Sequence, residues 1–145
     1  MSKQRWYITA AFVGLLADQL AKWAAVSVLP PGGATKSWGA GFGLTTYINN
    51  QFAWSWPIPN NVVIIFSILL FALGVFIYFR RARAQPELWP IWLIGSGALS
   101  NFIDRIFRHG VVDYFLVPGG GVINLADILI IIGVLFLASN TKKNK

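Results

Sequence analysis

Four of the five acidic residues in this 145-residue chain lie in or beside strongly apolar stretches. They are Asp18, Asp104, Asp113 and Asp127, whereas Glu87 lies in a polar segment. A charged side chain at the centre of a bilayer costs about 2.5–3.5 kcal/mol on insertion scales, so carboxylates are rare in membrane spans and usually have a function there. A chain that places nearly all of its acid in such surroundings is expected to use it for chemistry.

Apolar residues dominate the sequence and fall into four long stretches. Hydrophobic residues make up 56% of the chain and charged residues only 12%, whereas a soluble domain carries about 25% charge. A membrane span requires about 20 apolar residues, and the candidate spans are 6–29, 62–79, 88–107 and 125–139. We therefore predict an all-α integral membrane protein with four transmembrane helices, in which residues 1–145 form one domain.

Lysine and arginine clusters precede the first predicted span and follow the second and the fourth. Their members are Lys3, Arg5, Arg80, Arg81, Arg83, Lys142, Lys143 and Lys145. Four spans bring these clusters to one side of the membrane, and the positive-inside rule then predicts that both termini are cytoplasmic. This distribution leaves no basic surface that indicates nucleic-acid binding. Asp18 and Lys22 interrupt the first apolar run, so we expect it to be retained rather than cleaved as a signal peptide.

Residues 30–60 form the only sizeable segment outside the predicted spans, and they lie on the outer face. Strand-favouring residues at 44–48 follow Gly39, Gly41 and Gly43. Aromatic side chains, which favour the headgroup zone of a membrane, crowd the same segment. We expect a small β-rich extracytoplasmic subdomain that lies on the membrane between the first and second helices. An aromatic belt that anchors an inert loop is an equally good interpretation of the composition alone.

Two groups of polar residues have spacings of three or four on predicted helices, which places each group on one helix face. They are Asp18 and Lys22 in the first span, and Asn101, Asp104, Arg105 and Arg108 in and just after the third. The simplest interpretation of each group is structural, because an aspartate held by a cation is usually a brace rather than a proton carrier.

Asp113 and Asp127 are expected to approach each other. Asp113 follows the third helix on the outer side, and the connection from Tyr114 to Ile123 is short enough to make the third and fourth helices antiparallel neighbours. Asn124 and Asp127 open the fourth helix with the spacing of a capping box, so capping alone is an alternative role for Asp127.

A pair of carboxylates in one poorly hydrated site shares a proton, because both cannot ionise easily. An aspartyl hydrolase needs such a pair: one carboxylate takes a proton from water while the other polarises the scissile carbonyl. The chain has no cysteine and only one histidine, His109, so a thiolate nucleophile is excluded and a metal centre or a Ser-His-Asp triad is disfavoured. We expect no metal and no cofactor.

Four motifs, in order along nearly the whole chain, resemble the lipoprotein signal peptidases, the signal peptidase II family of bacterial inner membranes. Asp18–Lys22 is similar to Asp-Gln-x-x-Lys, Gly97–Arg105 to Gly-Ala-Leu-Gly-Asn-x-x-Asp-Arg, Gly110–Tyr114 to a motif that ends in Asp-Phe, and Asn124–Asp127 to Asn-x-Ala-Asp. The resemblance implies a membrane aspartic endopeptidase that removes the signal peptide from diacylglyceryl-modified prolipoproteins, cutting just before the lipidated cysteine. It also implies an active site at the outer face of the membrane.

The resemblance implies that Asp113 and Asp127 are the catalytic dyad. The residues that it implies for substrate binding or for shaping the site are Asn49, Asn101, Asp104, Arg105, Asn124, Asp18 and Lys22. The expected partners are the prolipoprotein substrate and membrane lipids, and we expect a monomer. The glycine- and aromatic-rich segment 37–56 is expected to close over the bound peptide.

Gln51 and Ser100 stand where the family has glycines, and Ile123 stands where an aromatic residue is usual. These differences keep two alternatives open. One is a relative that binds lipoproteins without cutting them, although the retained aspartates argue against it. The other is a small proton-coupled membrane carrier that uses the same aspartates as a relay, although Asp113 and Asp127 map to the outer edge of the membrane rather than to its middle.

Overall fold

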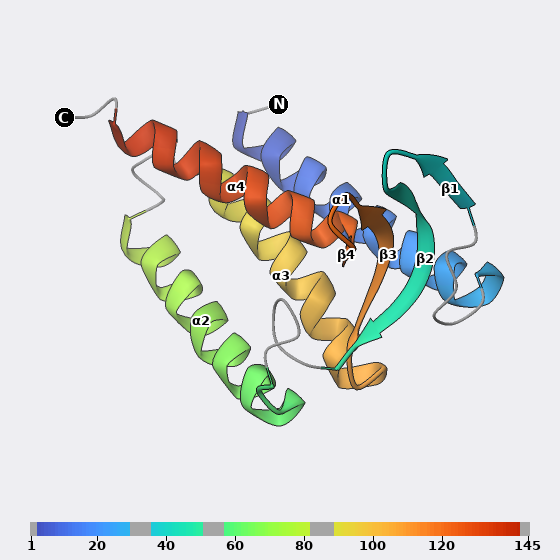
Figure 1. The fold of residues 1–145 in the computed structure, drawn as a ribbon. Helices are drawn as coiled ribbons and strands as arrows, with labels where there is room; N and C mark the ends of the chain where they lie inside the picture. Colours follow the sequence, from blue (N-terminus) through green and yellow to red (C-terminus); the bar gives the residue numbers. More distant parts are fainter. Residues whose placement is uncertain (1–2, 30–35, 51–56, 82–88, 143–145) are drawn as a thin grey trace.

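The computed structural model describes residues 3–29, 36–50, 57–81 and 89–142. In these residues the chain forms four helices and one small antiparallel sheet. The helices are α1 (Lys3–Val28), α2 (Asn60–Arg81), α3 (Pro90–Phe107) and α4 (Leu125–Lys142). Helix α3 contacts the other three helices. Its most extensive interface is with α4, which lies beside it in Figure 1. The four predicted helices are therefore present, with bounds close to those of the apolar stretches.

Length and apolarity set α1 apart from the other helices. Within the described part of the chain, Arg5–Val28 is the one helical segment long and apolar enough to cross a membrane by these measures. The apolar segments of α2 and α4, Asn60–Phe76 and Leu125–Ser139, are shorter. The number of transmembrane helices therefore stays a prediction.

The sheet joins two hairpins from separate parts of the chain. Its strands are β1 (Lys36–Gly39), β2 (Phe42–Asn49), β3 (Val111–Val117) and β4 (Gly121–Ile123). They are paired in the order β1-β2-β3-β4, and each pair is antiparallel. The pairing of β2 with β3 sets Tyr47 opposite Asp113 and Asn49 opposite Val111. The two loop regions of the chain thus form a single unit.

The predicted β-rich subdomain between the first two helices is only half of this sheet. The other half comes from β3 and β4, where only a short connection from Tyr114 to Ile123 is predicted. Valine and aromatic residues in this segment favour strands, and Gly119 and Gly120 form the turn with φ of 95° and 83°, which glycine adopts readily. Asp113 therefore lies on a strand. Residues 30–35 and 51–56 of the predicted subdomain lie outside the described residues.

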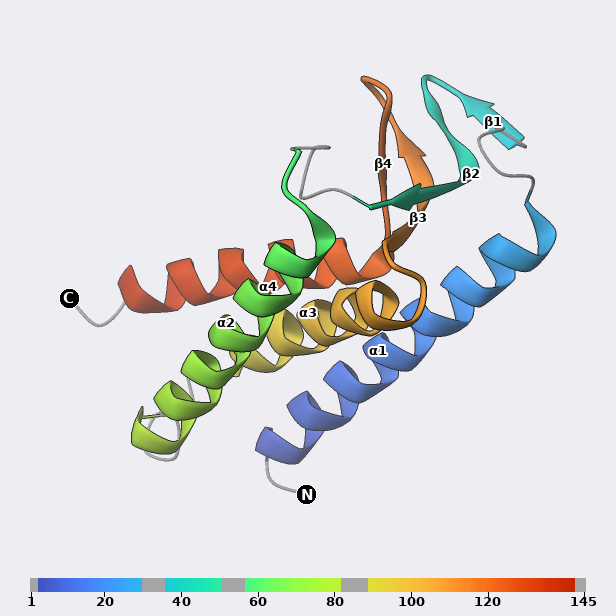
Figure 2. The ribbon, with the colours of Figure 1, turned by 90° about the horizontal axis from the view of Figure 1, so that it is seen from below.

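The sheet lies at one end of the helical bundle, which we call the sheet end. Figures 1 and 2 show it beside the last turns of α1 and α3 and the first turn of α4. The first turn of α1 and the last turn of α4 lie at the opposite end. Every loop that the structure describes between strands and helices therefore converges on the sheet end.

Two glycines allow α3 and α4 to approach each other closely. A Cβ atom added at Gly97 would lie 2.4 Å from the carbonyl oxygen of Ala126, and one added at Gly133 would lie 2.6 Å from Cγ1 of Ile94. Side chains at these two positions would push the helices apart. The close approach places the first turn of α4 against the middle of α3.

The interior of the sheet end is polar, whereas the outside of the helices is apolar. Asp18, Lys22, Ser100, Asp104 and Asn124 are each 0% exposed. In the described residues, no buried side-chain nitrogen or oxygen lacks a hydrogen-bond partner. The exposed side chains along the helices include Phe12, Leu20, Trp23, Ile65, Leu69, Phe76, Ile131 and Leu135. The polar side chains are thus gathered into one satisfied network inside the bundle.

Candidate active site

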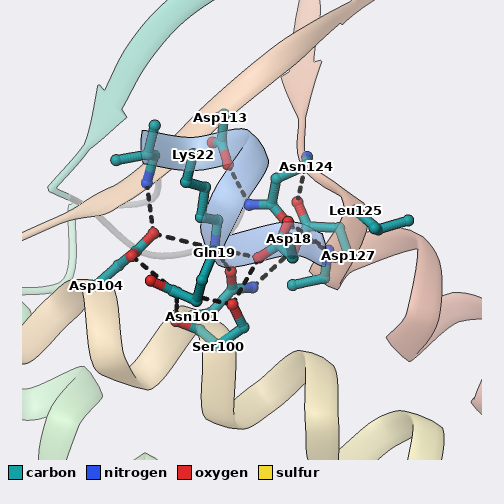
Figure 3. A network of polar contacts seen from close by, with 12 residues as sticks. Asp18, Gln19, Lys22, Ser100, Asn101, Asp104, Asp113, Asn124, Leu125 and Asp127 are labelled. Carbon is teal, nitrogen blue, oxygen red and sulfur yellow. Dashed lines mark hydrogen bonds and ion pairs between the residues drawn. The ribbon is translucent and has the colours of Figure 1, made fainter. Parts of the chain in front are cut away.

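Asp113 and Asp127 reach one site from two different elements. Asp113 lies on β3 and is 4% exposed, and Asp127 lies half-buried in the first turn of α4. The side chain of Asn124 lies between them (Figure 3). Its Nδ2 donates to Oδ1 of Asp113 at 2.6 Å, and its Oδ1 accepts from the backbone N–H of Asp127 at 2.9 Å. The structure therefore brings the two aspartates to either side of one buried amide.

The capping box predicted at the start of α4 is present. The Asn124 side chain accepts from the backbone N–H of Asp127, and the backbone N–H of Asn124 donates to Oδ2 of Asp127 at 3.3 Å. These two bonds satisfy donors that a helix start leaves without intrahelical partners. Capping uses only Oδ2 of Asp127, and the other carboxylate oxygen, Oδ1, faces Asn101 of α3.

The surroundings of Asp113 favour its protonated form. Burial is the largest cause, and the negative charge of Asp127 is the next; together they raise the pKa of Asp113 to about 7. Hydrogen bonds from Asn124 and Asn49 and the positive charge of Lys22 oppose this rise. At neutral pH this carboxyl group therefore exists in both protonation states, which suits it to proton transfer.

Asn101 connects Asp127 to the buried cation. Its Nδ2 donates to Oδ1 of Asp127 at 2.9 Å, and its Oδ1 accepts from Nζ of Lys22 at 2.8 Å. Because the ammonium group only donates hydrogen bonds, it fixes the orientation of the Asn101 amide. The NH2 group of that amide therefore faces the carboxylate of Asp127.

Lys22 is also the centre of a buried ion-pair group. Its Nζ lies 2.8 Å from Oδ2 of Asp18 and 3.0 Å from Oδ2 of Asp104. Arg108 pairs with the other oxygen of Asp104, and the backbone N–H of Val112 donates to Asp104 at 3.1 Å. The predicted pairings of Asp18 with Lys22 and of Asp104 with Arg108 are thus confirmed. Through Val112, Asp104 also holds the strand next to Asp113.

Arg105 joins the start of α2 to the site. Its Nη1 donates to Oδ1 of Asn60 at 2.9 Å, and Nδ2 of Asn60 donates back to the carbonyl oxygen of Arg105 at 3.2 Å. Arg105 is 7% exposed, and its guanidinium group interacts electrostatically with Asp113 and Asp127. It therefore supplies positive charge on the α3 side of the two aspartates.

Asn49 ends β2 beside the aspartates, and its side chain is hydrogen-bonded to Asp113. Gly110 allows this approach, since a Cβ atom there would lie 3.0 Å from the carbonyl oxygen of Asn49. The structure thus brings all nine residues singled out from the sequence to the sheet end. Gln51, which replaces a family glycine, lies outside the described residues. So do the other residues of 51–56, the last part of the segment 37–56 that is expected to close over the peptide.

Sequence reasoning missed three polar residues of the network. Nε2 of Gln19 donates to two oxygens of Ser100, its backbone carbonyl oxygen and its Oγ. It also donates to Oδ1 of Asp104. Oγ of Ser100, a residue that stands where the family has a glycine, donates to Asp18 at 2.6 Å. Tyr114 was treated as part of a loop, but its hydroxyl donates to Asp18 at 3.0 Å. Adjacency to Asp18 and Asp113 in the sequence was the available signal for Gln19 and Tyr114.

Comparison with known proteins identifies the chain. A family model described as signal peptidase (SPase) II matches residues 10–142. The chain belongs to this family. The predicted resemblance is therefore confirmed, and the protein is a peptidase. Within the described parts of the chain, no group of three or more histidine, cysteine or acidic residues has an arrangement that could hold a metal ion.

Individual relatives agree with the family model. A lipoprotein signal peptidase of Gloeothece citriformis is 36% identical over 143 residues, which cover 94% of this chain and 89% of the relative. One of Anoxybacillus flavithermus is 31% identical over 137 residues, with 90% and 82% covered. Two solved structures, each described as a bacterial membrane enzyme, have the same fold. The first has a TM-score of 0.87 at 24% identity, and the match covers 95% of this chain and 88% of that structure. The second has a TM-score of 0.83 at 25% identity, and the match covers 96% of this chain and 94% of that structure.

Proposed function

We propose that this chain removes the signal peptide from diacylglyceryl-modified prolipoproteins, cutting just before the lipidated cysteine, with Asp113 and Asp127 as the catalytic pair. Membership of the signal peptidase II family supports the reaction. The observation that carries the residue assignment is the buried Asn124 amide, which is hydrogen-bonded to the side chain of Asp113 and to the backbone of Asp127. The other two aspartates, Asp18 and Asp104, each form a salt bridge with a lysine or an arginine. Among the described residues, no such salt bridge involves Asp113 or Asp127.

In the proposed reaction Asp127 is the base and Asp113 holds the proton. Asp127 accepts hydrogen bonds from Asn101 and from the backbone N–H of Asn124, and these stabilise its ionised form. A water molecule gives its proton to Asp127 as its oxygen bonds to the scissile carbonyl carbon. Asp113, whose pKa of about 7 keeps it partly protonated, hydrogen-bonds the carbonyl oxygen. The carbon–nitrogen bond then breaks as the leaving nitrogen takes a proton from the pair.

The remaining polar residues have supporting roles in this proposal. Arg105 offsets the negative charge that develops on the carbonyl oxygen. Asn49, at the end of β2 and hydrogen-bonded to Asp113, is placed to contact the peptide. Asp18, Lys22 and Asp104 hold the elements that carry the site.

We further infer that the single domain 1–145 crosses the bacterial inner membrane four times, with both termini in the cytoplasm and the sheet end at the outer face. The apolar exposed surface of the helices supports this placement, because lipid rather than water would surround it. The polar interior at the sheet end then lies near the outer membrane surface, where water reaches the scissile bond. A protein in the same bilayer as its substrate also restricts how that substrate can approach, which favours productive encounters.

The test compares the detergent-solubilised wild type with Asp113→Asn and Asp127→Asn on a purified diacylglyceryl-modified prolipoprotein, with cleavage read as a gel shift. We expect cleavage by the wild type and none by either variant, at thermal unfolding temperatures that show all three to be folded. An active Asp113→Asn or Asp127→Asn variant would refute the dyad assignment. Cleavage of the same prolipoprotein without its diacylglyceryl group, at an equal rate, would refute the substrate assignment.

A further inference from the structure

Within the described residues Asp18 is hydrogen-bonded to neither Asp113 nor Asp127, but its partners lie next to both. Its Oδ1 accepts from the hydroxyl of Tyr114 at 3.0 Å and from the backbone N–H of Ala126 at 3.1 Å. Its Oδ2 accepts from Oγ of Ser100 at 2.6 Å and lies 2.8 Å from Nζ of Lys22. A carboxylate has about four acceptor positions, so this fully buried group is saturated. One side chain of α1 thus binds β3, α3 and the first turn of α4.

The contacts of Asp18 fall beside the reacting groups in the sequence. Tyr114 directly follows Asp113, and Ala126 directly precedes Asp127. The Tyr114 hydroxyl also accepts from the backbone N–H of Leu125 at 3.1 Å. The same hydroxyl therefore links the strand that carries one aspartate to the helix turn that carries the other.

The hydroxyl groups of Ser100 and Tyr114, which both donate to Asp18, each have a fixed orientation. The Ser100 hydroxyl donates its single hydrogen to Asp18 and accepts a hydrogen bond from Nε2 of Gln19 at 2.8 Å. The Tyr114 hydroxyl donates its hydrogen to Asp18 and accepts a hydrogen bond from the backbone N–H of Leu125. Burial raises the pKa of Tyr114 above its ordinary value, so this hydroxyl stays a donor throughout the neutral pH range.

We propose that Tyr114 and Ser100 are positioning residues that act through Asp18 to set the separation between the carboxyl groups of Asp113 and Asp127. The inference rests on the proposed role of those two aspartates. Removing the Tyr114 hydroxyl leaves the Leu125 N–H unpaired and releases β3 from the first turn of α4. Removing the Ser100 hydroxyl releases α3 from Asp18, which then has only α1, β3 and α4 to hold it.

The expected signature is loss of rate rather than of binding. A displacement of about 1 Å in a reacting group can cost about 100-fold in rate. We expect Tyr114→Phe and Ser100→Ala each to lower kcat about 10- to 100-fold, with KM within about twofold of the wild type. We also expect the pH profile of kcat to shift, because the coupling between the two carboxyl groups depends on their separation. The double variant should lose less than the product of the two single losses, because both act through Asp18.

Matched control substitutions remove hydroxyl groups elsewhere in the bundle. Tyr7→Phe removes a hydroxyl from a ring that stacks on Trp89 with centroids 4.7 Å apart. Ser67→Ala removes a hydroxyl that donates to the carbonyl oxygen of Val63 in its own helix at 2.8 Å. Both controls should keep the wild-type kcat, KM and pH profile.

The decisive experiment measures kcat, KM and the pH profile of all variants on the lipidated prolipoprotein, with rates expressed per folded enzyme from thermal unfolding in detergent. Wild-type kcat and pH profile per folded molecule in Tyr114→Phe and Ser100→Ala would overturn the inference, and so would a loss confined to KM. An active Asp127→Asn variant in the same assay would instead overturn the proposed dyad, so the two failures are distinguishable.

Discussion

The ammonium group of Lys22 lies 2.8 Å from the side-chain oxygen of Asn101, and this contact determines which end of the Asn101 amide faces Asp127. A reversed amide would direct its oxygen at the carboxylate and repel it. A buried cation on α1 therefore controls a hydrogen-bond donor on α3, which in turn contacts a carboxylate on α4. Three helices thus meet at Asp127, the proposed catalytic base, through one lysine and one asparagine.

This relay predicts that Asn101→Ala lowers kcat about 10- to 100-fold. A hydrogen bond to a charged group contributes about 1.5–3 kcal/mol, and each 1.4 kcal/mol corresponds to about tenfold in rate. The variant leaves Lys22 paired with Asp18 and Asp104, so we expect the fold to survive. Steady-state cleavage and thermal unfolding in detergent test both parts. A wild-type rate would show that Asp127 needs no donor from α3.

Lys22→Met should destabilise the protein far more than Arg108→Gln. Removing Lys22 leaves the buried carboxylate of Asp18 without a counter-ion and Asp104 with only Arg108, and breaking such a buried pair costs about 3–5 kcal/mol. The Arg108 side chain is 28% exposed, so water compensates for part of its loss and the cost should be about 1 kcal/mol. Thermal unfolding in detergent compares the two variants. Equal losses would mean that the lysine is not the centre of the ion-pair group.

Asp113 is expected to make the protein less stable as the pH rises. Its folded-state pKa of about 7 lies above the ordinary carboxyl range, so between about pH 4 and pH 7 the folded state binds more protons than the unfolded state. Under that condition the free energy of unfolding falls with rising pH. We predict that Asp113→Asn reduces this slope, as measured by unfolding temperatures at pH 5 and pH 7.5. Identical slopes in the wild type and the variant would show that Asp113 titrates in its ordinary range.

The same titration should limit catalysis from the alkaline side. Above about pH 7 the proton of Asp113 is lost, and a pair in which both groups are ionised has no acid to polarise the carbonyl. We expect kcat of the wild type to decline above this pH. A kcat that stays constant to pH 9 would contradict the assignment of Asp113 as the acid.

Local patterns in the sequence were enough to predict the helices, the capping box and the salt bridges at helical spacing. Asp18 with Lys22 and Asp104 with Arg108 are four residues apart and form as expected. The pairing of Lys22 with Asp104 joins α1 to α3, and helical spacing carries no information on such a contact. It depends on how two helices are rotated about their own axes.

The strand that carries Asp113, β3, is not among the elements predicted from the sequence. Residues 111–117 are rich in strand-favouring side chains, and a glycine turn follows them, which together are the signature of a hairpin. Its pairing with β2 could not be read from either segment alone, because the partners are more than 60 residues apart along the chain. Backbone partners of side chains, such as Ala126 for Asp18, depend on the same tertiary arrangement.

Gly97 and Gly95 offer a matched pair of substitutions on α3. A Cβ atom at Gly97 would lie 2.4 Å from the carbonyl oxygen of Ala126, whereas one at Gly95 would meet nothing within 4 Å. Gly97→Ala must therefore displace the first turn of α4 together with Asp127. We expect it to cost about 1–3 kcal/mol of stability and at least about tenfold in kcat, since small displacements of reacting groups are costly.

Gly95→Ala should have the opposite effect on stability and none on rate. Alanine in a helix interior is more favourable than glycine by about 0.5–1 kcal/mol, and this position has open space for the methyl group. Unfolding temperatures and kcat on the lipidated prolipoprotein distinguish the two variants. If Gly97→Ala kept the wild-type rate, the position of Asp127 would not depend on the close approach of α3 and α4. If Gly95→Ala also lost activity, the loss in Gly97→Ala could not be attributed to the contact with Ala126.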